Sequence, residues 1–266
     1  MRRSPVQVWT PAPGKARVPR ICGNPFFVGF FSAVYDIIYT KTFDIPEDFF
    51  VAKKHLFFVR HGKTEWNGQY RFQGRSDVPL NEEGQKQAEA LAVRIRTWKD
   101  ACFFTSTLSR AAETARILSS GCRSERLEKR EGLSEMSFGV WEGLSIFEAE
   151  TADPDAFRKW KQSPFEHIPP GGEPYPEIMN RVSAVLDEAL SSKEERIVLV
   201  SHGGIIRAAL SILLGLSPSS VWKMKLSNCS VTAVESGKRG CSLVFLNDDL
   251  HTLLSSEILP DIPFPA

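Results

Sequence analysis

The sequence predicts an α/β fold of three layers, α/β/α, in which helices cover both faces of a mostly parallel β-sheet. It also predicts a small cap-like insertion that lies over the expected ligand site. Two observations lead to this prediction. Short apolar runs alternate with helical segments along most of the chain, an order typical of a parallel sheet with helices on both faces. The segment from Gly132 to Pro176 interrupts the alternation, because it is rich in glycine, proline and aromatic residues and has weak periodicity. We expect this segment to form the cap.

The first half of the chain predicts two strand-helix units. The apolar run Leu56–Val59 ends in a polar loop, as a buried parallel strand does. Apolar residues at helical spacing then predict a helix from Asn81 to Trp98, with Asn81 as its N-cap. A second apolar run, Ala101–Phe104, precedes a predicted helix over Arg110–Leu118, for which Ser109 is the expected N-cap.

The second half repeats the same order. A predicted helix, Glu177–Leu190, is followed by a strand over Arg196–Val200 and a helix over Ile205–Leu214. Two late apolar segments, Val231–Val234 and Leu243–Leu246, have two glycines between them and predict a closing hairpin or two separate strands.

Composition and charge exclude several classes of protein. Hydrophobic residues make up 42% and charged residues 24% of the 266 residues, which is typical of a folded globular protein. The net charge of +1 gives no general attraction to nucleic acid or to an anionic membrane, so we expect neither as a partner and expect any anion site to be local. Five widely spaced cysteines without a C-x-x-C pair indicate neither a disulfide framework nor a thiolate zinc site, and favour a cytoplasmic location. The oligomeric state is not predicted.

Residues 1–50 differ from the rest of the chain. A basic, proline-rich start precedes an apolar stretch, Phe26–Tyr39, which is shorter than the roughly 18 residues of a membrane helix. A signal peptide is one interpretation, although no clear cleavage site follows. The alternative is that Val51, followed by Ala-Lys-Lys-His, is the native start. We expect an extension over residues 1–50 that is disordered or not native, a domain over residues 51–250 and a C-terminal tail over residues 251–266.

Two of the predicted strands end in histidine and glycine, at His61-Gly62 and at His202-Gly203. Ligands of open α/β sheets bind beyond the carboxyl ends of the strands, so the two histidines are expected to face one crevice. A single histidine after a strand is more often structural than catalytic, but two in matching contexts favour catalysis. The remaining histidines lack such a context and are expected to be structural or solvated: His55, His167 and His251.

Two arginines also follow apolar strands, Arg60 directly and Arg110 at a predicted helix N-terminus. A guanidinium group binds phosphate oxygens through paired hydrogen bonds and keeps its charge at any working pH. An isolated arginine is usually a surface ion-pair partner. Beside two histidines in one crevice, Arg60 and Arg110 indicate a phosphate pocket.

Four ordered segments resemble the motifs of the histidine phosphatase superfamily, to which phosphoglycerate mutases belong. They are the opening signature (Arg60–Asn67 and Phe72–Leu80), a second arginine motif (Ser106–Ala115), an acid motif (Leu133–Gly143) and a second histidine motif (Val200–Gly204). The resemblance covers about His55 to Leu246. It implies a phosphoglycerate mutase-like fold and an enzyme that acts on a small phosphorylated metabolite.

The resemblance also implies roles for individual residues. His61 is expected to be the nucleophile that forms a phosphohistidine, while Arg60, Arg110 and His202 hold the phosphoryl oxygens. Glu135 is expected to protonate the leaving oxygen and later to activate water, with the neighbouring Glu142 as its rival. This chemistry needs no metal and no cofactor. Weaker assignments to the phosphate loop or the substrate are Gly62, Thr64, Asn67, Gln73, Gly74 and Gly203, whereas Asp77, Pro79 and Leu80 are expected to fix the turn into the next helix.

Phosphatase and mutase remain alternatives within the superfamily. The segment Phe138–Gly143 resembles the phosphatase subgroup that includes α-ribazole-phosphate phosphatases, an activity linked to cobalamin biosynthesis, and Arg75 follows Gly74 where mutases usually have tryptophan. A late loop that often reads Gly-Gly-Glu-Ser in this family has Pro174 in place of the serine here. The serine hydroxyl is therefore absent, which leaves any substrate contact by that loop open. A non-catalytic phosphate-binding module is a further alternative. A serine hydrolase is disfavoured because no G-x-S-x-G elbow is present, and a metallophosphatase because no ligand spacing is found.

Overall fold

The computed structural model describes residues 53–98, 100–238 and 240–253 of the chain. The predicted extension over residues 1–50 lies outside these ranges, as does the predicted tail beyond residue 253. Among the described residues, no helix combines the length and the apolar character needed to cross a membrane.

The described residues form one sheet of six strands, in the order β3-β2-β4-β1-β5-β6. β1 pairs in parallel with β4, β4 with β2, and β2 with β3, whereas β5 runs antiparallel to both β1 and β6. The mostly parallel sheet and the closing hairpin are therefore confirmed. The strands are β1 (Lys54–Arg60), β2 (Cys102–Thr105), β3 (Leu127–Lys129), β4 (Arg196–Ser201), β5 (Val231–Gly237) and β6 (Gly240–Asp248).

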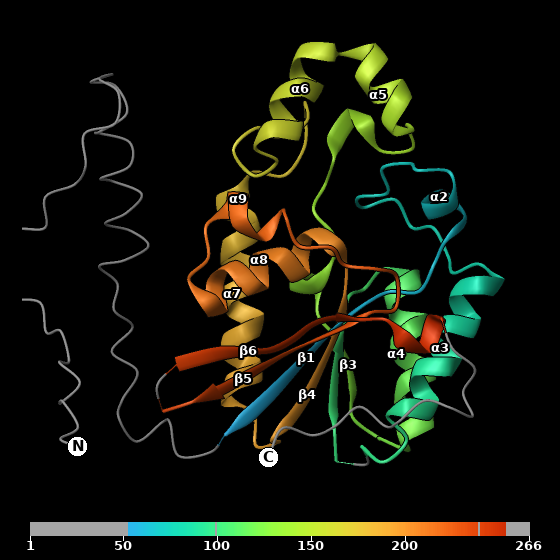
Figure 1. Ribbon diagram of the computed structural model, residues 1–266, viewed down its shortest axis with the longest axis vertical. Coiled ribbons are helices and arrows are strands. Elements are labelled where there is room, and N and C mark those ends of the chain that lie inside the picture. The colour runs from blue at the N-terminus through green and yellow to red at the C-terminus, as the bar shows by residue number, and fades with distance from the viewer. Residues whose placement is uncertain (1–52, 99, 239, 254–266) are drawn as a thin grey trace, which may run out of the picture. The chain divides into compact units, whose positions relative to one another are not determined.

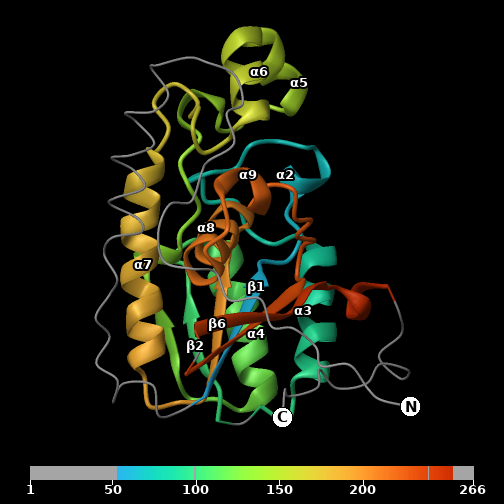
Figure 2. The ribbon, with the colours of Figure 1, turned by 60° about the vertical axis from the view of Figure 1, so that its left-hand side comes forward.

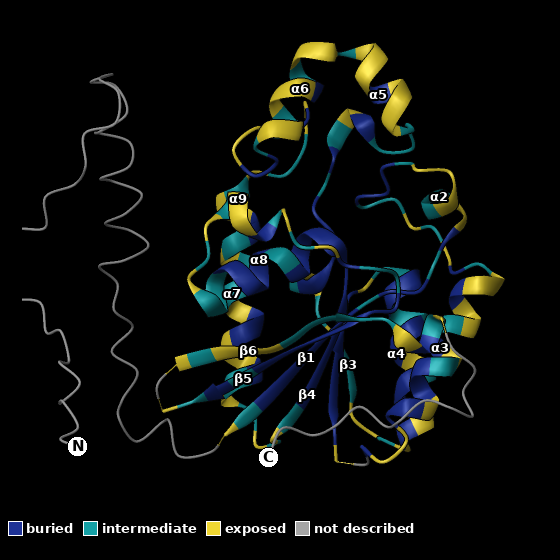
Figure 3. Ribbon diagram, in the orientation of Figure 1, coloured by how far each residue is buried: buried dark blue, intermediate teal, exposed yellow. Residues whose placement is uncertain are grey.

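Helices cover both faces of the sheet, which gives the three predicted layers (Figures 1 and 2). Alternate residues of β1 point to opposite faces: Phe57 packs with α3 and α4, while Phe58 packs with α7 and α8. The central strands are buried (Figure 3). The helices are α2 (Glu65–Gly68), α3 (Glu82–Arg94), α4 (Ser109–Cys122), α5 (Ile146–Ala152), α6 (Pro154–Gln162), α7 (Tyr175–Ser191), α8 (Gly203–Leu214) and α9 (Pro218–Val221), with 3₁₀ turns η2 (Glu131–Leu133), η3 (Gly139–Trp141) and η4 (Leu250–Thr252).

The predicted cap segment contains the helices α5 and α6, which the weak periodicity of the sequence did not indicate. Figures 1 and 2 show both helices beyond the carboxyl ends of β1 and β4. Each begins at a side-chain cap, Ser145 for α5 and Asp153 for α6. Their outer sides are exposed, whereas the buried Phe157 of α6 packs against Trp141, with ring centroids 5.6 Å apart. These short helices depend on one aromatic cluster more than on a continuous apolar face.

The start of α4 differs from the prediction. Ser109 is the first residue of the helix, and the N-cap is Leu108, whose side chain makes no capping hydrogen bond. Asp77 supplies the missing cap from a distant loop, because its Oδ1 accepts from the Ser109 backbone N–H at 2.7 Å. Asp77 therefore fixes the start of α4, which carries Arg110, whereas it was expected to fix the turn into α3. The pattern of local residues could not reveal a cap from another loop.

Candidate active site

His61 directly follows β1 and is buried at the carboxyl end of the sheet. Its backbone N–H donates to the carbonyl of Ser201, the last residue of β4, at 2.9 Å. Its Nδ1 lies 2.7 Å from the carbonyl oxygen of Gly62. Because a carbonyl oxygen only accepts hydrogen bonds, Nδ1 carries the proton and Nε2 of the neutral ring keeps a lone pair. The imidazole thus has an unprotonated ring nitrogen, which nucleophilic attack would need.

His202 follows β4 and lies beside His61, with ring centroids 5.1 Å apart. Its Nε2 contacts the hydroxyl of Ser106 at 2.9 Å, while its Nδ1 is buried without a hydrogen-bond partner among the described residues. Burial lowers the pKa of both imidazoles well below the usual 6.5, and the positive charges of Arg110 and Arg60 lower it further. Both rings are therefore neutral at pH 7, the state in which an imidazole can act as a nucleophile.

Arg60 and Arg110 place two guanidinium groups beside the histidines. The buried Arg110 donates to the carbonyls of Gly74 and Ser76, both at 2.8 Å, and Arg60 donates to the carbonyl of Leu226 at 2.6 Å. In each arginine the Nε atom is buried and has no partner in the described part of the chain. Burial lowers the pKa of Arg110 to about 10, so it stays cationic at neutral pH. Buried cationic donors without acceptors favour the binding of an anion.

Glu135 brings a single carboxylate next to these cations. It is 9% exposed, and its charge raises the pKa of both Arg60 and Arg110 against the effect of burial. Its Oε1 accepts from the Met136 backbone N–H at 3.0 Å, and its Oε2 accepts from that of Gly204, in the first turn of α8, at 3.2 Å. The carboxyl group retains lone pairs for proton transfer.

The rival carboxylate, Glu142, has a different environment. Its oxygens accept from the backbone N–H groups of Arg75, Ser76 and Phe138 at 3.0 to 3.1 Å. They also accept from the hydroxyl groups of Ser76 and Ser137 at 2.9 and 3.0 Å. With five donors on two oxygens, Glu142 joins the loop around residue 75 to the acid motif and is suited to a structural role.

Gly74 explains why this loop approaches so closely. Its φ of +52° is in the left-handed region, and a Cβ at this position would overlap the carboxylate of Glu142. Its carbonyl is one of the two acceptors of Arg110. The preceding Gln73 is buried, and its Oε1 has no partner among the described residues. Gly74 thus positions Arg110 through its backbone, while the neighbouring Gln73 contributes a buried acceptor without a partner among the described residues.

Thr64 and Asn67 form a capping box at the start of α2. The Thr64 hydroxyl accepts from the Asn67 backbone N–H at 3.2 Å, and Asn67 Oδ1 accepts from the Thr64 backbone N–H at 3.1 Å. These contacts shape the loop after His61. Gly62 donates its backbone N–H to Thr114 Oγ1 at 3.1 Å, and Gly203 is the first residue of α8.

Sequence analysis missed three residues that contact this cluster: Ser106, Asn228 and Arg207. Ser106 was quoted only as part of a motif, yet it orients His202. Asn228 Nδ2 donates to the carbonyl of His61 at 3.1 Å across 167 residues of sequence. Arg207 was the only one with a local signal, because it lies one helical turn after Gly203 and therefore on the same face of α8.

His251, expected to be structural or solvated, is structural. It is buried, its Nε2 lies 3.0 Å from the carbonyl of Cys229, and its Nδ1 lies 3.2 Å from Arg94 Nη1. Burial, together with the charge of Arg94, lowers its pKa to about 4. Within the described ranges, no group of three or more histidine, cysteine or acidic residues is arranged to hold a metal ion.

Comparisons with known proteins agree with this fold. A model of the histidine phosphatase superfamily (branch 1) matches residues 56–249. Phosphoserine phosphatase 1 of Hydrogenobacter thermophilus is 31% identical over 74% of this chain and 93% of its own, and the probable phosphoglycerate mutase GpmB of Proteus mirabilis is 35% identical over 68% and 84%. The structure of the α-ribazole phosphatase of Shigella flexneri has a TM-score of 0.66 at 25% identity and covers 73% of this chain and 96% of its own.

Proposed function

Because the chain belongs to the histidine phosphatase superfamily, we propose that it hydrolyses a small phosphorylated metabolite through a phosphohistidine on His61. One observation carries the proposal. The buried His61 ring is held by its Nδ1, so that the lone pair of Nε2 is free beside the two arginines with unpaired Nε atoms. That combination provides a nucleophile and an anion pocket in the same place.

In the first step, His61 Nε2 attacks the phosphorus atom of the ester. The N–P bond forms as the bond from phosphorus to the ester oxygen breaks, and Glu135 gives its proton to that oxygen, so that an alcohol leaves. Arg60, Arg110 and the Nδ1 side of His202 stabilise the charge on the remaining phosphoryl oxygens. An alkoxide is a poor leaving group, so its protonation matters most in this step.

In the second step, the Glu135 carboxylate takes a proton from water as the water oxygen attacks phosphorus. The N–P bond breaks, its electron pair returns to His61 Nε2, and inorganic phosphate leaves. Glu135 is protonated again and His61 is neutral, so the enzyme is ready for the next cycle.

The identity of the substrate is a finer proposal. α-Ribazole 5'-phosphate is one candidate, supported by the motif around Phe138 and by the likeness to the Shigella enzyme. Phosphoserine is supported by the likeness to the Hydrogenobacter enzyme. Phosphoryl transfer to a second sugar or acid, as in a mutase, is the alternative that the GpmB relative supports. The two reactions share the first step and differ in whether water accepts the phosphoryl group.

The test is the release of inorganic phosphate from p-nitrophenyl phosphate and from a panel of phosphorylated metabolites. We expect turnover by the wild-type chain and none by His61→Ala. Conversion of 3-phosphoglycerate to 2-phosphoglycerate without phosphate release would favour the mutase, and phosphate binding without turnover of any substrate would favour a binding module.

A further inference from the structure

Arg207 places a third guanidinium group beside the phosphate pocket. Its Nη1 donates to the carbonyl of Gly203 at 2.9 Å, and its Nη2 donates to that of Met224 at 2.8 Å. A Cβ on Gly203 would lie 3.1 Å from Arg207 Nη1 and 3.8 Å from Arg60 Nε. The two guanidinium groups therefore lie close to each other beside Gly203.

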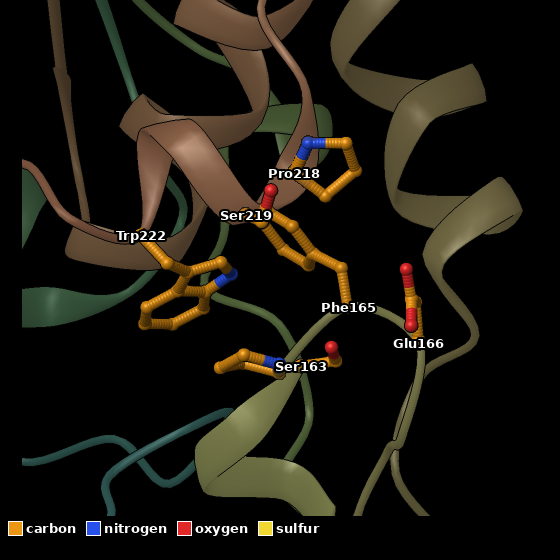
Figure 4. A pocket seen from close by; sticks show the side chains of 7 residues that line it. Ser163, Phe165, Glu166, Pro218, Ser219 and Trp222 are labelled. Atoms are coloured by element: carbon orange, nitrogen blue, oxygen red, sulfur yellow. The ribbon is translucent and has the colours of Figure 1, made fainter. Parts of the chain in front are cut away.

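Arg207 also contacts Trp222, which follows α9 and packs against aromatic residues of the cap. Its guanidinium lies over the ring of Trp222, 4.7 Å from the centroid. Trp222 in turn packs edge-on against Trp160 of α6 and Phe165, with centroids 6.3 and 5.2 Å apart. Figure 4 shows Trp222 and Phe165 beside Pro218 in a small hollow between the turn after α6 and α9. Arg207 thus lies between the phosphoryl group's position and the cap, where the leaving group would extend.

Several buried donors in this region have no acceptor. Arg207 Nε, Trp160 Nε1 and Trp222 Nε1 are buried and have no hydrogen-bond partner among the described residues. A buried N–H group without a partner costs free energy, and the cost is larger for a charged group. An acceptor on the leaving group that reaches Arg207 Nε would remove the cost of that charged donor.

The charges in the region favour an anion. Burial, together with the charge of Arg60, lowers the pKa of Arg207 to about 10, while the charge of Glu135 opposes both effects. Arg207 remains cationic at neutral pH beside the like charge of Arg60. Glu135 is the carboxylate that acts on it, and in the proposed mechanism it holds its proton until the leaving oxygen takes that proton.

We propose that Arg207 is a specificity-determining residue that binds a carboxylate on the leaving group. The substrate class is then phosphate esters of small hydroxy acids, whose carboxylate lies a few bonds from the ester oxygen. A single planar guanidinium matches a carboxylate through paired N–H donors, and the face of Trp222 supports its orientation. The inference rests on the proposed phosphatase activity and refines its substrate.

The test uses pairs of substrates that differ only in the carboxylate: phosphoserine against phosphoethanolamine, and phosphoglycolate against ethyl phosphate. For the wild-type chain we expect kcat/KM to be roughly 10- to 100-fold higher for the acid of each pair, the range expected of one charged hydrogen-bonded contact. In Arg207→Gln this ratio should fall to about one. Arg207→Lys, which keeps the charge but not the planar fork, should retain part of it.

Arg158→Gln is the matched control, because Arg158 is an exposed arginine of α6 that pairs with Asp155. It should leave the ratio unchanged. If Arg207 only holds the segment around Met224, its variants would lower kcat/KM for both members of a pair equally, and that result would overturn the proposal. A wild-type enzyme that prefers the member without the carboxylate would overturn it as well.

Different results would refute the role of Arg207 and the phosphatase activity on which it rests. Turnover of p-nitrophenyl phosphate through a phosphohistidine, without preference for a carboxylate, would refute the role of Arg207 and leave the phosphatase intact. Absence of turnover with every ester would refute the phosphatase itself, and the substrate class with it.

Discussion

Glu135 and Glu142 are seven residues apart, but their surroundings suit them to different tasks. Glu135 accepts two backbone hydrogen bonds beside the phosphate pocket, whereas Glu142 accepts five hydrogen bonds within its loop. We predict that Glu135→Gln lowers the rate on an alkyl phosphate by roughly 10²–10⁴, the usual range for general acid-base catalysis. Phosphorylation of His61 by p-nitrophenyl phosphate should lose much less, because nitrophenolate leaves without a proton.

The measurement is stopped-flow release of nitrophenol. Glu135→Gln should give an initial burst and then a slow steady state, because the same carboxylate activates water in the second step. Glu142→Gln serves as the comparison, and its main effect should be a lower free energy of unfolding. A uniform loss without a burst would mean that Glu135 only organises the pocket, and a burst confined to Glu142→Gln would move the role there.

The main charged and imidazole groups of the candidate site were predictable because each lies in a local motif. Arg60 and His61 end one strand, His202 ends its neighbour, and parallel pairing brings both ends together. Arg207 and Asn228 were missed for a physical reason. Their partners are backbone carbonyls of distant segments, and a carbonyl has no sequence signature. The catalytic roles remain predictions until they are measured.

At the level of elements, α4 depends on Asp77 for its first turn. Leu108 offers no side-chain cap, and the Asp77 carboxylate accepts the Ser109 N–H at the positive end of the helix dipole. Asp77→Ala should lower the free energy of unfolding by about 1 kcal/mol, as loss of a helix cap typically does. Because Arg110 is the second residue of α4, KM for the phosphate ester should rise as well.

Chemical denaturation with phosphate-release kinetics measures both effects. Asp77→Asn keeps an acceptor and should recover most of the stability. The exposed Asp155 of α6 is the control, and Asp155→Ala should change stability less and KM not at all. Equal behaviour of the Ala variants at the two positions would contradict the assignment.

The mostly parallel sheet and the two helical layers followed from the sequence, because alternating apolar runs and amphipathic segments allow few arrangements. The short strand β3 and the helices α5 and α6 did not. β3 has three residues, none of them fully buried, so it shows no apolar run. The cap helices pack through the cluster of Phe72, Trp141 and Trp160, which long-range contacts assemble.

For the whole molecule, buried histidines couple stability to pH. His61, His202 and His251 all have pKa values below their usual 6.5. From pH 6.5 down to the folded pKa of each histidine, the unfolded chain therefore binds protons that the folded chain does not. Stability should therefore fall as pH falls below 6.5. Each group contributes about 1.4 kcal/mol per pH unit where the unfolded form is protonated and the folded form is not.

His251 allows this coupling to be tested away from the active site. Its folded pKa of about 4 defines a window between pH 4 and 6.5. Over that window, His251→Gln should reduce the slope of the unfolding free energy against pH by about 1.4 kcal/mol per pH unit, the contribution of one proton. Urea unfolding at several pH values measures the slope, with His167→Gln as the control at an exposed position. An unchanged slope in His251→Gln would contradict the linkage.

The proposed mechanism requires that His61 carry the phosphoryl group during turnover. Rapid quenching with ³²P-labelled p-nitrophenyl phosphate detects this intermediate. We expect a phosphoprotein that is labile in acid and stable in base, that forms faster than steady-state turnover in Glu135→Gln, and that is absent in His61→Ala. A label that persists in His61→Ala, or turnover by the wild-type chain without a labelled intermediate at any quench time, would contradict it.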